Sequence, residues 1–318
     1  MNKLSILSPC YNGERFLDNY FSNLMEQTYQ DYEIIIVNDG STDNSDKIIQ
    51  KYKDIFEKKG YTFKYLNKQK NEGHAKAIND GLKLVEGTYL MWPDIDDHMH
   101  SDHLASRIFF MDNNQEYDIA LGKCGVYDVN NLETPLFYAW KIFPKTKKEL
   151  INEFILGEDK NIGFMSGIFI IRTQSFFEIY KTRSIYADIK VGPTIQMVFP
   201  LLYKGKTGYI DNDTFDYYIH GNNQHIANAK SDYYNIQLVY ENVVEQIGLE
   251  ATEAKKIIAM AQNVSNRLLL SYSLRVNDKV LAKNSWKKLK NNCGVRLKEA
   301  MKYIIIRSPL LYKIYTKF

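Results

Sequence analysis

Hydrophobic and polar positions follow two different periods along the first hundred residues. Short apolar runs suited to strands, such as Leu4–Ser8 and Tyr32–Val37, alternate with amphipathic stretches of helical spacing, such as Glu14–Gln27. This alternation is typical of βαβ units around a parallel sheet. It predicts strands over Leu4–Ser8, Tyr32–Val37, Tyr61–Leu66 and Thr88–Trp92, and helices over Glu14–Gln27, Ile48–Phe56 and Ala75–Val85.

The rest of the chain is less regular and then becomes helical. A helix is expected over Ser101–Asn113, and strands over Tyr117–Gly122, Gly167–Arg172 and Thr207–Ile210. From about Ser231 helical periodicity predicts Tyr234–Gln246, Glu250–Tyr272 and Ser285–Ile306. The fold class expected is therefore α/β, a mostly parallel sheet flanked by helices over residues 1–230, with a C-terminal helical subdomain over 231–318.

Composition excludes several classes of protein. The chain has 318 residues, of which 45% are hydrophobic and 25% are charged, so neither a disordered nor a collagen-like protein is expected. The three cysteines, Cys10, Cys124 and Cys293, are odd in number and far apart, which favours a reducing compartment over a disulfide scaffold. No signal peptide or membrane-spanning run is recognisable, so a cytoplasmic location is expected.

Charge is concentrated at the C-terminus. Residues 283–318 carry ten lysines and arginines against the single acid Glu299, whereas the net charge of the whole chain is only +3. Aromatic and aliphatic residues are interleaved with these cations. We expect this tail to lie on an anionic membrane surface, with a helix packed on its own domain or a homodimer interface as alternatives. A nucleic-acid partner is not expected, because the rest of the chain is acidic and has no such motif.

Candidate binding residues follow the predicted strands. Ligands of open parallel sheets bind at the carboxyl ends of the strands, and these positions are rich in carboxylates here. The chain has neither the G-x-G-x-x-G nor the P-loop pattern, so phosphates would have to be neutralised otherwise. Mg²⁺ or Mn²⁺ held by Asp94-x-Asp96 could do this, although a D-x-D alone also occurs in simple polar turns.

Five motifs together resemble the family 2 glycosyltransferases of GT-A fold. They are S-P-C-Y-N-G-E at 8–14, V-N-D-G-S-T-D at 37–43, N-E-G-H-A-K-A-I-N-D-G at 71–81, E-G-T-Y-L at 86–90 and D-I-D-D at 94–97. The resemblance implies a Rossmann-like domain over 1–230, with a nucleotide-binding half (1–100) and an acceptor and catalytic half (101–230). It also implies inverting sugar transfer from a nucleoside diphosphate, most often UDP, with Mn²⁺ or Mg²⁺.

The resemblance assigns roles to residues of the first half. Tyr11 would stack on the base, Asp39 would accept the ring N–H of uracil or thymine, Asp94 would hold ribose and Asp96 the metal. Lys76 could add a cation near the phosphates or be an ordinary solvated lysine. The nucleotide-sugar site expected in full comprises Pro9, Tyr11, Asn12, Glu14, Asp39, Lys76 and Asp94.

The second half matches the family less closely. Asp188 resembles the base that deprotonates the acceptor hydroxyl, but Ala187 stands where the family usually has glutamate, and Glu158-Asp159 is a rival acidic pair. The acceptor pocket expected comprises Trp92, Met165, Ser166 and Gly167.

Histidines offer further candidates. His220 resembles the family's late third metal ligand, with a surface loop as the alternative. His98, His100 and His103 are expected to be helix-start residues rather than zinc ligands.

The function expected is transfer of a sugar from a UDP-sugar to a hydroxyl of a growing surface glycan, with a lipid-linked acceptor at the inner face of the membrane. Two alternatives stay open. A polyprenyl-phosphate sugar transferase shares the N-terminal motifs, and a non-catalytic nucleotide-sugar or glycan-binding module would explain Ala187.

Overall fold

The computed structural model describes residues 3–156, 165–188, 192–220, 229–292 and 294–316. The chain forms two compact units, residues 1–220 and 221–318. The boundary expected near residue 230, and the division of the first domain into two functional halves, stay predictions.

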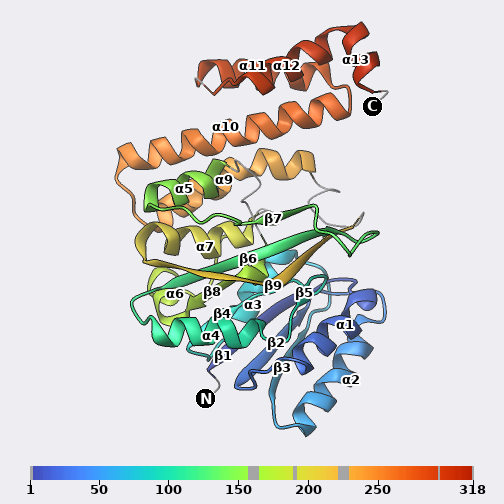
Figure 1. Ribbon diagram of the computed structural model, residues 1–318, viewed down its shortest axis with the longest axis vertical. Helices are drawn as coiled ribbons and strands as arrows, with labels where there is room; N and C mark the ends of the chain where they lie inside the picture. Colours follow the sequence, from blue (N-terminus) through green and yellow to red (C-terminus); the bar gives the residue numbers. More distant parts are fainter. Residues whose placement is uncertain (1–2, 157–164, 189–191, 221–228, 293, 317–318) are drawn as a thin grey trace. The chain divides into compact units, whose positions relative to one another are not determined.

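The first unit is built on one mixed sheet (Figure 1). Its strands run in the order β3-β2-β1-β4-β8-β6-β9-β5, with β7 paired to β6. The strands are β1 (Leu4–Cys10), β2 (Tyr32–Asn38), β3 (Thr62–Asn67), β4 (Tyr89–Met91), β5 (His98–Met99), β6 (Ile119–Asp128), β7 (Phe137–Ala139), β8 (Phe169–Arg172) and β9 (Thr207–Ile219).

The four N-terminal strands are parallel, and their winding changes direction once. Both β2 and β4 pair in parallel with β1, and β3 pairs in parallel with β2. The direction of winding therefore reverses between β1 and β4, which is where open α/β sheets bind ligands. Because crossovers are right-handed, α1 and α2 cover one face of this part of the sheet and α3 the other (Figure 1).

Helices of the first unit connect these strands. They are α1 (Glu14–Met25), α2 (Ser45–Lys58), α3 (His74–Leu82), α4 (His103–Asn113), α5 (Lys147–Leu156), α6 (Thr173–Ile179) and α7 (Pro193–Lys204), with a 3₁₀ turn η2 at Ser166–Ile168. The expected α/β architecture, a sheet flanked by helices, is confirmed. Every residue of β2 is buried, as its unbroken apolar run predicted.

Two predicted strands are much longer than expected. The strand expected over Tyr117–Gly122 is β6, which runs to Asp128, and the one expected over Thr207–Ile210 is β9, which runs to Ile219. The two pair in parallel with register shifts between Gly122 and Gly125. A bulge of this kind interrupts the alternation of inward and outward side chains. A prediction based on that alternation therefore ends the strand at the bulge.

The second unit is helical, as predicted. It contains α9 (Ala229–Gln246), α10 (Ala251–Arg275), α11 (Lys279–Asn291), α12 (Leu297–Arg307) and α13 (Pro309–Tyr315). The single helix expected over Ser285–Ile306 is wrong, because α11 ends at Asn291 and Arg296 is extended before α12 begins. The run N-N-C-G at 291–294 carries a helix-stop signal that the hydrophobic period conceals.

No helix among the described residues has the length and apolarity needed to cross a bilayer. Cys10 and Cys124 are buried free thiols, and Cys293 lies outside the described residues.

Candidate active site at the carboxyl ends of the parallel strands

The loops that follow β1 and β2 are locked together by side chains. The Asn12 carboxamide oxygen accepts from the Thr42 backbone N–H at 2.8 Å, and the Asn12 N–H donates to the Ser41 hydroxyl at 2.8 Å. Glu14, the first residue of α1, accepts from the Asn44 N–H at 2.9 Å. Asn12 and Glu14 therefore hold the two loops in register, whereas Tyr11, directly before Asn12, is 42% exposed. Pro9 lies within β1.

Asp39 is buried directly after β2 and is surrounded by donors. It is 2% exposed and accepts from the backbone N–H groups of Glu72 (3.1 Å) and Gly73 (2.7 Å). The Lys68 ammonium forms an ion pair with it at 2.9 Å. The Asp39 carboxylate is thus held in one orientation by the loop that follows β3.

Lys68 was missed by the sequence analysis, although a signal existed. It is the first residue beyond β3, and carboxyl-end positions were considered only for the first, second and fourth strands. Burial lowers the pKa of Lys68, but the bonds to Asp39 and Glu72 outweigh burial, and its pKa stands above the ordinary value. Lys68 is therefore a permanent cation beside Asp39.

Gly40 allows this loop to approach Asp39. Its φ is +70°, and a Cβ at this position would lie 2.3 Å from the backbone carbonyl carbon of Lys70. A larger residue would therefore both strain the backbone and push the two loops apart.

The D-x-D loop after β4 places three carboxyl groups in three environments. Asp94 accepts from the Ser166 hydroxyl at 2.8 Å, and Asp96 lies 2.9 Å from Nε2 of His220. Asp97 is 3% exposed, and burial together with the charges of Asp96 and Asp94 raises its pKa well above the ordinary value. The Ser8 hydroxyl anchors the start of the loop by donating to the Pro93 carbonyl at 2.6 Å.

His220 comes from a distant part of the chain. It follows the last residue of β9, and its ring also lies 3.4 Å from the Arg15 guanidinium and 5.1 Å from the Phe16 ring. A carboxylate and an imidazole at this separation, with substrate phosphate oxygens beside them, form a donor set that suits Mn²⁺ or Mg²⁺. The structure therefore brings together the two residues expected to bind the metal.

The segment before Asp188 is clamped by two amide side chains. Asn79 of α3 exchanges two hydrogen bonds with the backbone of Ile185, both at 2.8 Å. Gln196 of α7 is 1% exposed, and its side chain exchanges two hydrogen bonds with the backbone of Tyr186, at 2.8 and 3.0 Å. Asp188 lies two residues beyond this anchored backbone and is exposed.

The residues expected to line the acceptor pocket are buried. Trp92 is 1% exposed and stacks on Phe169 with a ring separation of 6.3 Å. Met165 and Ser166 are 6% and 1% exposed, and a Cβ on Gly167 would lie 2.2 Å from the Phe215 ring. Of this set, Ser166 is joined to the D-x-D loop through Asp94.

The remaining candidates are a lysine, an acidic pair and three histidines. Lys76 is exposed on α3. Glu158 and Asp159, the rival base, lie outside the described residues. Of the three histidines expected at a helix start, His103 begins α4, but His98 lies on β5 and His100 directly after it. The helix-start prediction is therefore wrong for His98 and His100.

The family model described as glycosyl transferase family 2 matches residues 5–178. The chain belongs to this family. The match covers more than half of the chain and includes all five motifs and the strands that carry them.

Two curated relatives match the N-terminal part. A teichoic acid poly(glycerol phosphate) polymerase of Staphylococcus epidermidis is 38% identical over 101 residues, 32% of this chain and 14% of that protein. A poly(ribitol-phosphate) beta-glucosyltransferase of Bacillus spizizenii is 37% identical over 123 residues, 38% of this chain and 19% of that protein. The chain thus matches less than a fifth of the length of either relative.

A solved structure matches nearly the whole chain. The crystal structure of Staphylococcus aureus TarS 1-349 in complex with UDP-GlcNAc superposes with a TM-score of 0.65, covering 99% of this chain and 88% of that one, at 19% identity. This likeness establishes a shared fold across both units.

The family 2 domain also buries a neutral histidine behind the site. His103 is 0% exposed between the Thr214 hydroxyl and the Gly167 carbonyl, both at 3.1 Å. Burial, and then the charge of Arg107, hold the pKa of His103 well below its ordinary value.

This burial predicts a loss of stability in acid. Below about pH 6.5 His103 becomes protonated in the unfolded chain but stays neutral in the folded chain. The free energy of unfolding therefore falls as the pH drops towards the folded-state pKa of His103. The extra slope of one such group approaches about 1.4 kcal/mol per pH unit. The free energy of unfolding is measured in urea between pH 7.5 and 5.5. The His103→Gln variant should show a smaller decrease of this free energy with falling pH than the wild type, and His74→Gln should show the same decrease as the wild type. An unchanged slope in His103→Gln would contradict the assignment.

Proposed function

We propose that the protein transfers a sugar, with inversion, from a UDP-sugar to a hydroxyl of a cell-surface glycan. The observation that carries this proposal is the meeting of Asp96 and His220 at 2.9 Å, on the same edge of the sheet as the buried Asp39. A UDP-sugar needs one recognition point for its base, which Asp39 would supply, and another for its diphosphate, which Asp96 and His220 would supply.

Asp39 suits a uracil base. The backbone N–H of Glu72 reaches both carboxylate oxygens, and the Gly73 N–H and the Lys68 ammonium each bind one of them, so the carboxylate is held in place. A carboxylate fixed in this way can accept the ring N–H of uracil or thymine, whereas cytosine presents an acceptor at that position and would be rejected. Tyr11 at the rim supplies an exposed aromatic face for the base.

Asp96 and His220 would hold a divalent cation, with Asp94 directed to the ribose. When bound, the ion neutralises the diphosphate and stabilises the departing UDP. The residues of the chain orient the donor for this step. Asp94 is fixed by Ser166, and Arg15 adds a cation beside His220.

Asp188 is the base we propose for the acceptor hydroxyl. Inverting transfer needs a carboxylate opposite the leaving group, and the clamps by Asn79 and Gln196 position the backbone that carries Asp188. Asp188 would accept the proton from the hydroxyl as the new glycosidic bond forms and the bond to UDP breaks.

The acceptor we propose is a polyol-phosphate or polysaccharide chain linked to a lipid. Both curated relatives are named for poly(glycerol phosphate) or poly(ribitol-phosphate) chains, and the TarS structure holds UDP-GlcNAc. The place of action would be the cytoplasmic face of the membrane.

A surface of the second unit supports this location. Leu297, Met301 and Ile304 are 78, 54 and 56% exposed and follow each other at helical spacing along α12. The opposite side of α12 packs through Ile306 and through Tyr303, which stacks on Trp286 at 4.6 Å.

The exposed apolar line continues onto α13 and is flanked by cations. Leu310, Leu311 and Ile314 are 69, 39 and 48% exposed. Lys298, Arg307 and Lys313 are exposed beside them. Apolar side chains between lysines and arginines fit an anionic lipid surface, where each cation contributes about 1 kcal/mol.

Donor binding gives the first test. Thermal shift with UDP and Mn²⁺ should raise the melting temperature, because a ligand at 100 times its Kd adds about 2.7 kcal/mol. Asp96→Asn should lose the Mn²⁺-dependent part, and Asp39→Asn should lose the preference for UDP over CDP. Asp102→Asn, an exposed aspartate at the start of α4, is the matched control. Equal shifts with UDP and CDP in the wild type would contradict the role of Asp39.

Catalysis gives the second test. Release of UDP from UDP-sugars should require an acceptor, and Asp188→Asn should lower kcat by about 10²- to 10⁴-fold while UDP affinity is unchanged. Glu158→Gln and Asp159→Asn are the comparison variants, and a loss confined to them would move the base to that pair. If polyprenyl phosphate is the acceptor that supports UDP release, the protein is instead a polyprenyl-phosphate sugar transferase. If the protein binds UDP-sugars but releases no UDP, it is a non-catalytic binding module.

Membrane docking gives the third test. The wild type should sediment with vesicles containing anionic phosphatidylglycerol and not with pure phosphatidylcholine. The double variant Leu297→Ser/Ile304→Ser should remain in the supernatant, whereas Val280→Ser, which alters an aliphatic side chain 71% exposed on α11, should sediment like the wild type. Unchanged sedimentation of the double variant, or its conversion from dimer to monomer by light scattering, would assign the surface to another partner.

A further inference from the structure

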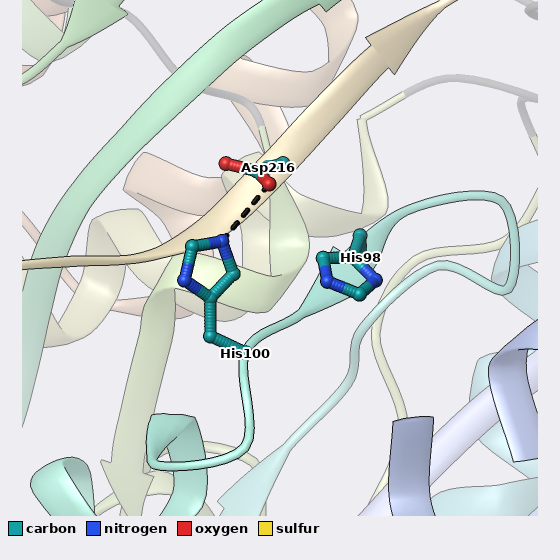
Figure 2. Close-up of side chains that lie close together, drawn as sticks. All are labelled: His98, His100 and Asp216. Carbon is teal, nitrogen blue, oxygen red and sulfur yellow. Dashed lines mark hydrogen bonds and ion pairs between the residues drawn. The ribbon is translucent and has the colours of Figure 1, made fainter. Parts of the chain in front are cut away.

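Three side chains with metal-ligating atoms lie together where β5 pairs with β9. His98, His100 and Asp216 each offer a ligand atom, and these three atoms lie within 4.8 Å of one another. Figure 2 shows both imidazole rings close to the Asp216 carboxylate, which the dashed line joins to His100. None of the three belongs to the donor site described above.

The Asp216 carboxylate is buried without a permanent cation. It is 8% exposed, and no lysine or arginine among the described residues forms an ion pair with it. Its Oδ2 lies 2.9 Å from Nε2 of His100, and its second oxygen, Oδ1, is buried without a hydrogen bond. A buried carboxylate is costly unless a positive charge compensates it, so this position favours a cation.

The neighbouring charges increase this demand. Asp213 is half-buried close by, and Lys123, whose charge acts on Asp213, is paired with Asp211. The local field is therefore negative, and His100 is the one group among the described residues that pairs with Asp216 when it carries a proton.

The donor set selects the class of metal. Two imidazole nitrogens and one carboxylate oxygen suit zinc and other first-row transition metals, whereas Mg²⁺ and Ca²⁺ prefer oxygen ligands. A tetrahedral ion about 2.1 Å from each ligand needs ligand atoms about 3.4 Å apart, which rotation of the side chains can provide. Three protein ligands would leave one position for water.

We propose that His98, His100 and Asp216 form a binding site for Zn²⁺ or a similar divalent transition metal, separate from the donor site. The backbone supports this arrangement, because His98 and Asp216 are directly opposite each other in the antiparallel pairing of β5 with β9. An ion here would cross-link a two-residue strand that has few hydrogen bonds of its own. It would thereby fix the loop of Asp96, which precedes β5, against His220, which follows β9.

The test uses the metal alone, without nucleotide, on the full chain freed of any affinity tag. Binding of Zn²⁺ is measured by calorimetry and by metal analysis after dialysis, and Co²⁺ provides visible absorption bands that report its ligands. His98→Gln/His100→Gln and Asp216→Asn remove ligands from the proposed site. Asp96→Asn/His220→Gln removes the donor pair, and His74→Gln is the matched histidine control.

The wild type should bind one Zn²⁺ that persists in Asp96→Asn/His220→Gln and in His74→Gln. Loss of a ligand should weaken this binding by at least about 100-fold, since even outer-shell changes cost 10- to 100-fold. Asp216→Asn keeps the size of the side chain, and its melting temperature without metal shows whether it folds. If it folds and binds Zn²⁺ as the wild type does, or if only the donor-pair variant loses the ion, the proposal is overturned. Neither result depends on sugar transfer.

Discussion

Negative charge crowded at one edge of a sheet is the constraint on which the site depends. Parallel strands place the residues that follow them at one edge of the sheet, and here Asp39 follows β2 while Asp94, Asp96 and Asp97 follow β4. Each buried carboxylate must be paired, hydrogen-bonded or protonated. The chain uses all three solutions: Lys68 for Asp39, the Ser166 hydroxyl for Asp94, His220 for Asp96 and a raised pKa for Asp97.

These compensating groups come from segments far apart in the sequence. Lys68 follows β3, Ser166 lies in η2 and His220 follows β9, so the carboxylate edge is complete only when the whole first unit has folded. The arrangement also leaves Asp96 without a permanent positive charge among its described partners. Asp96 has an imidazole rather than a lysine or arginine as its described partner, and an imidazole can give up its proton and coordinate a metal. A donor diphosphate with its cation fits this deficit in charge.

The first hundred residues could be predicted because their structure is local. In β1 to β4 the side-chain pattern, the turn residues and the burial all agree, so the strands and the motifs after them followed from the sequence with boundaries shifted by a residue or two. The long strands β6 and β9 could not, because their pairing contains a bulge and depends on partners about ninety residues away. The clamps by Asn79 and Gln196 could not be predicted for the same reason. A buried amide side chain has no signature in the local sequence, and only the tertiary structure shows which backbone groups it binds.

The trio of His98, His100 and Asp216 shows how such non-local pairing changes the meaning of a motif. In the sequence, the two histidines look like polar residues beside a D-x-D, and the third ligand is more than a hundred residues away. Asp216 lies on β9 and His220 follows its last residue, so the two are four residues apart, which along an extended chain is about 13 Å. Ions that share a phosphate in two-metal sites lie about 3.5–4 Å apart. The trio therefore belongs to a different stretch of the strand from His220, and an ion there would act on donor binding through the geometry of the β5–β9 pair.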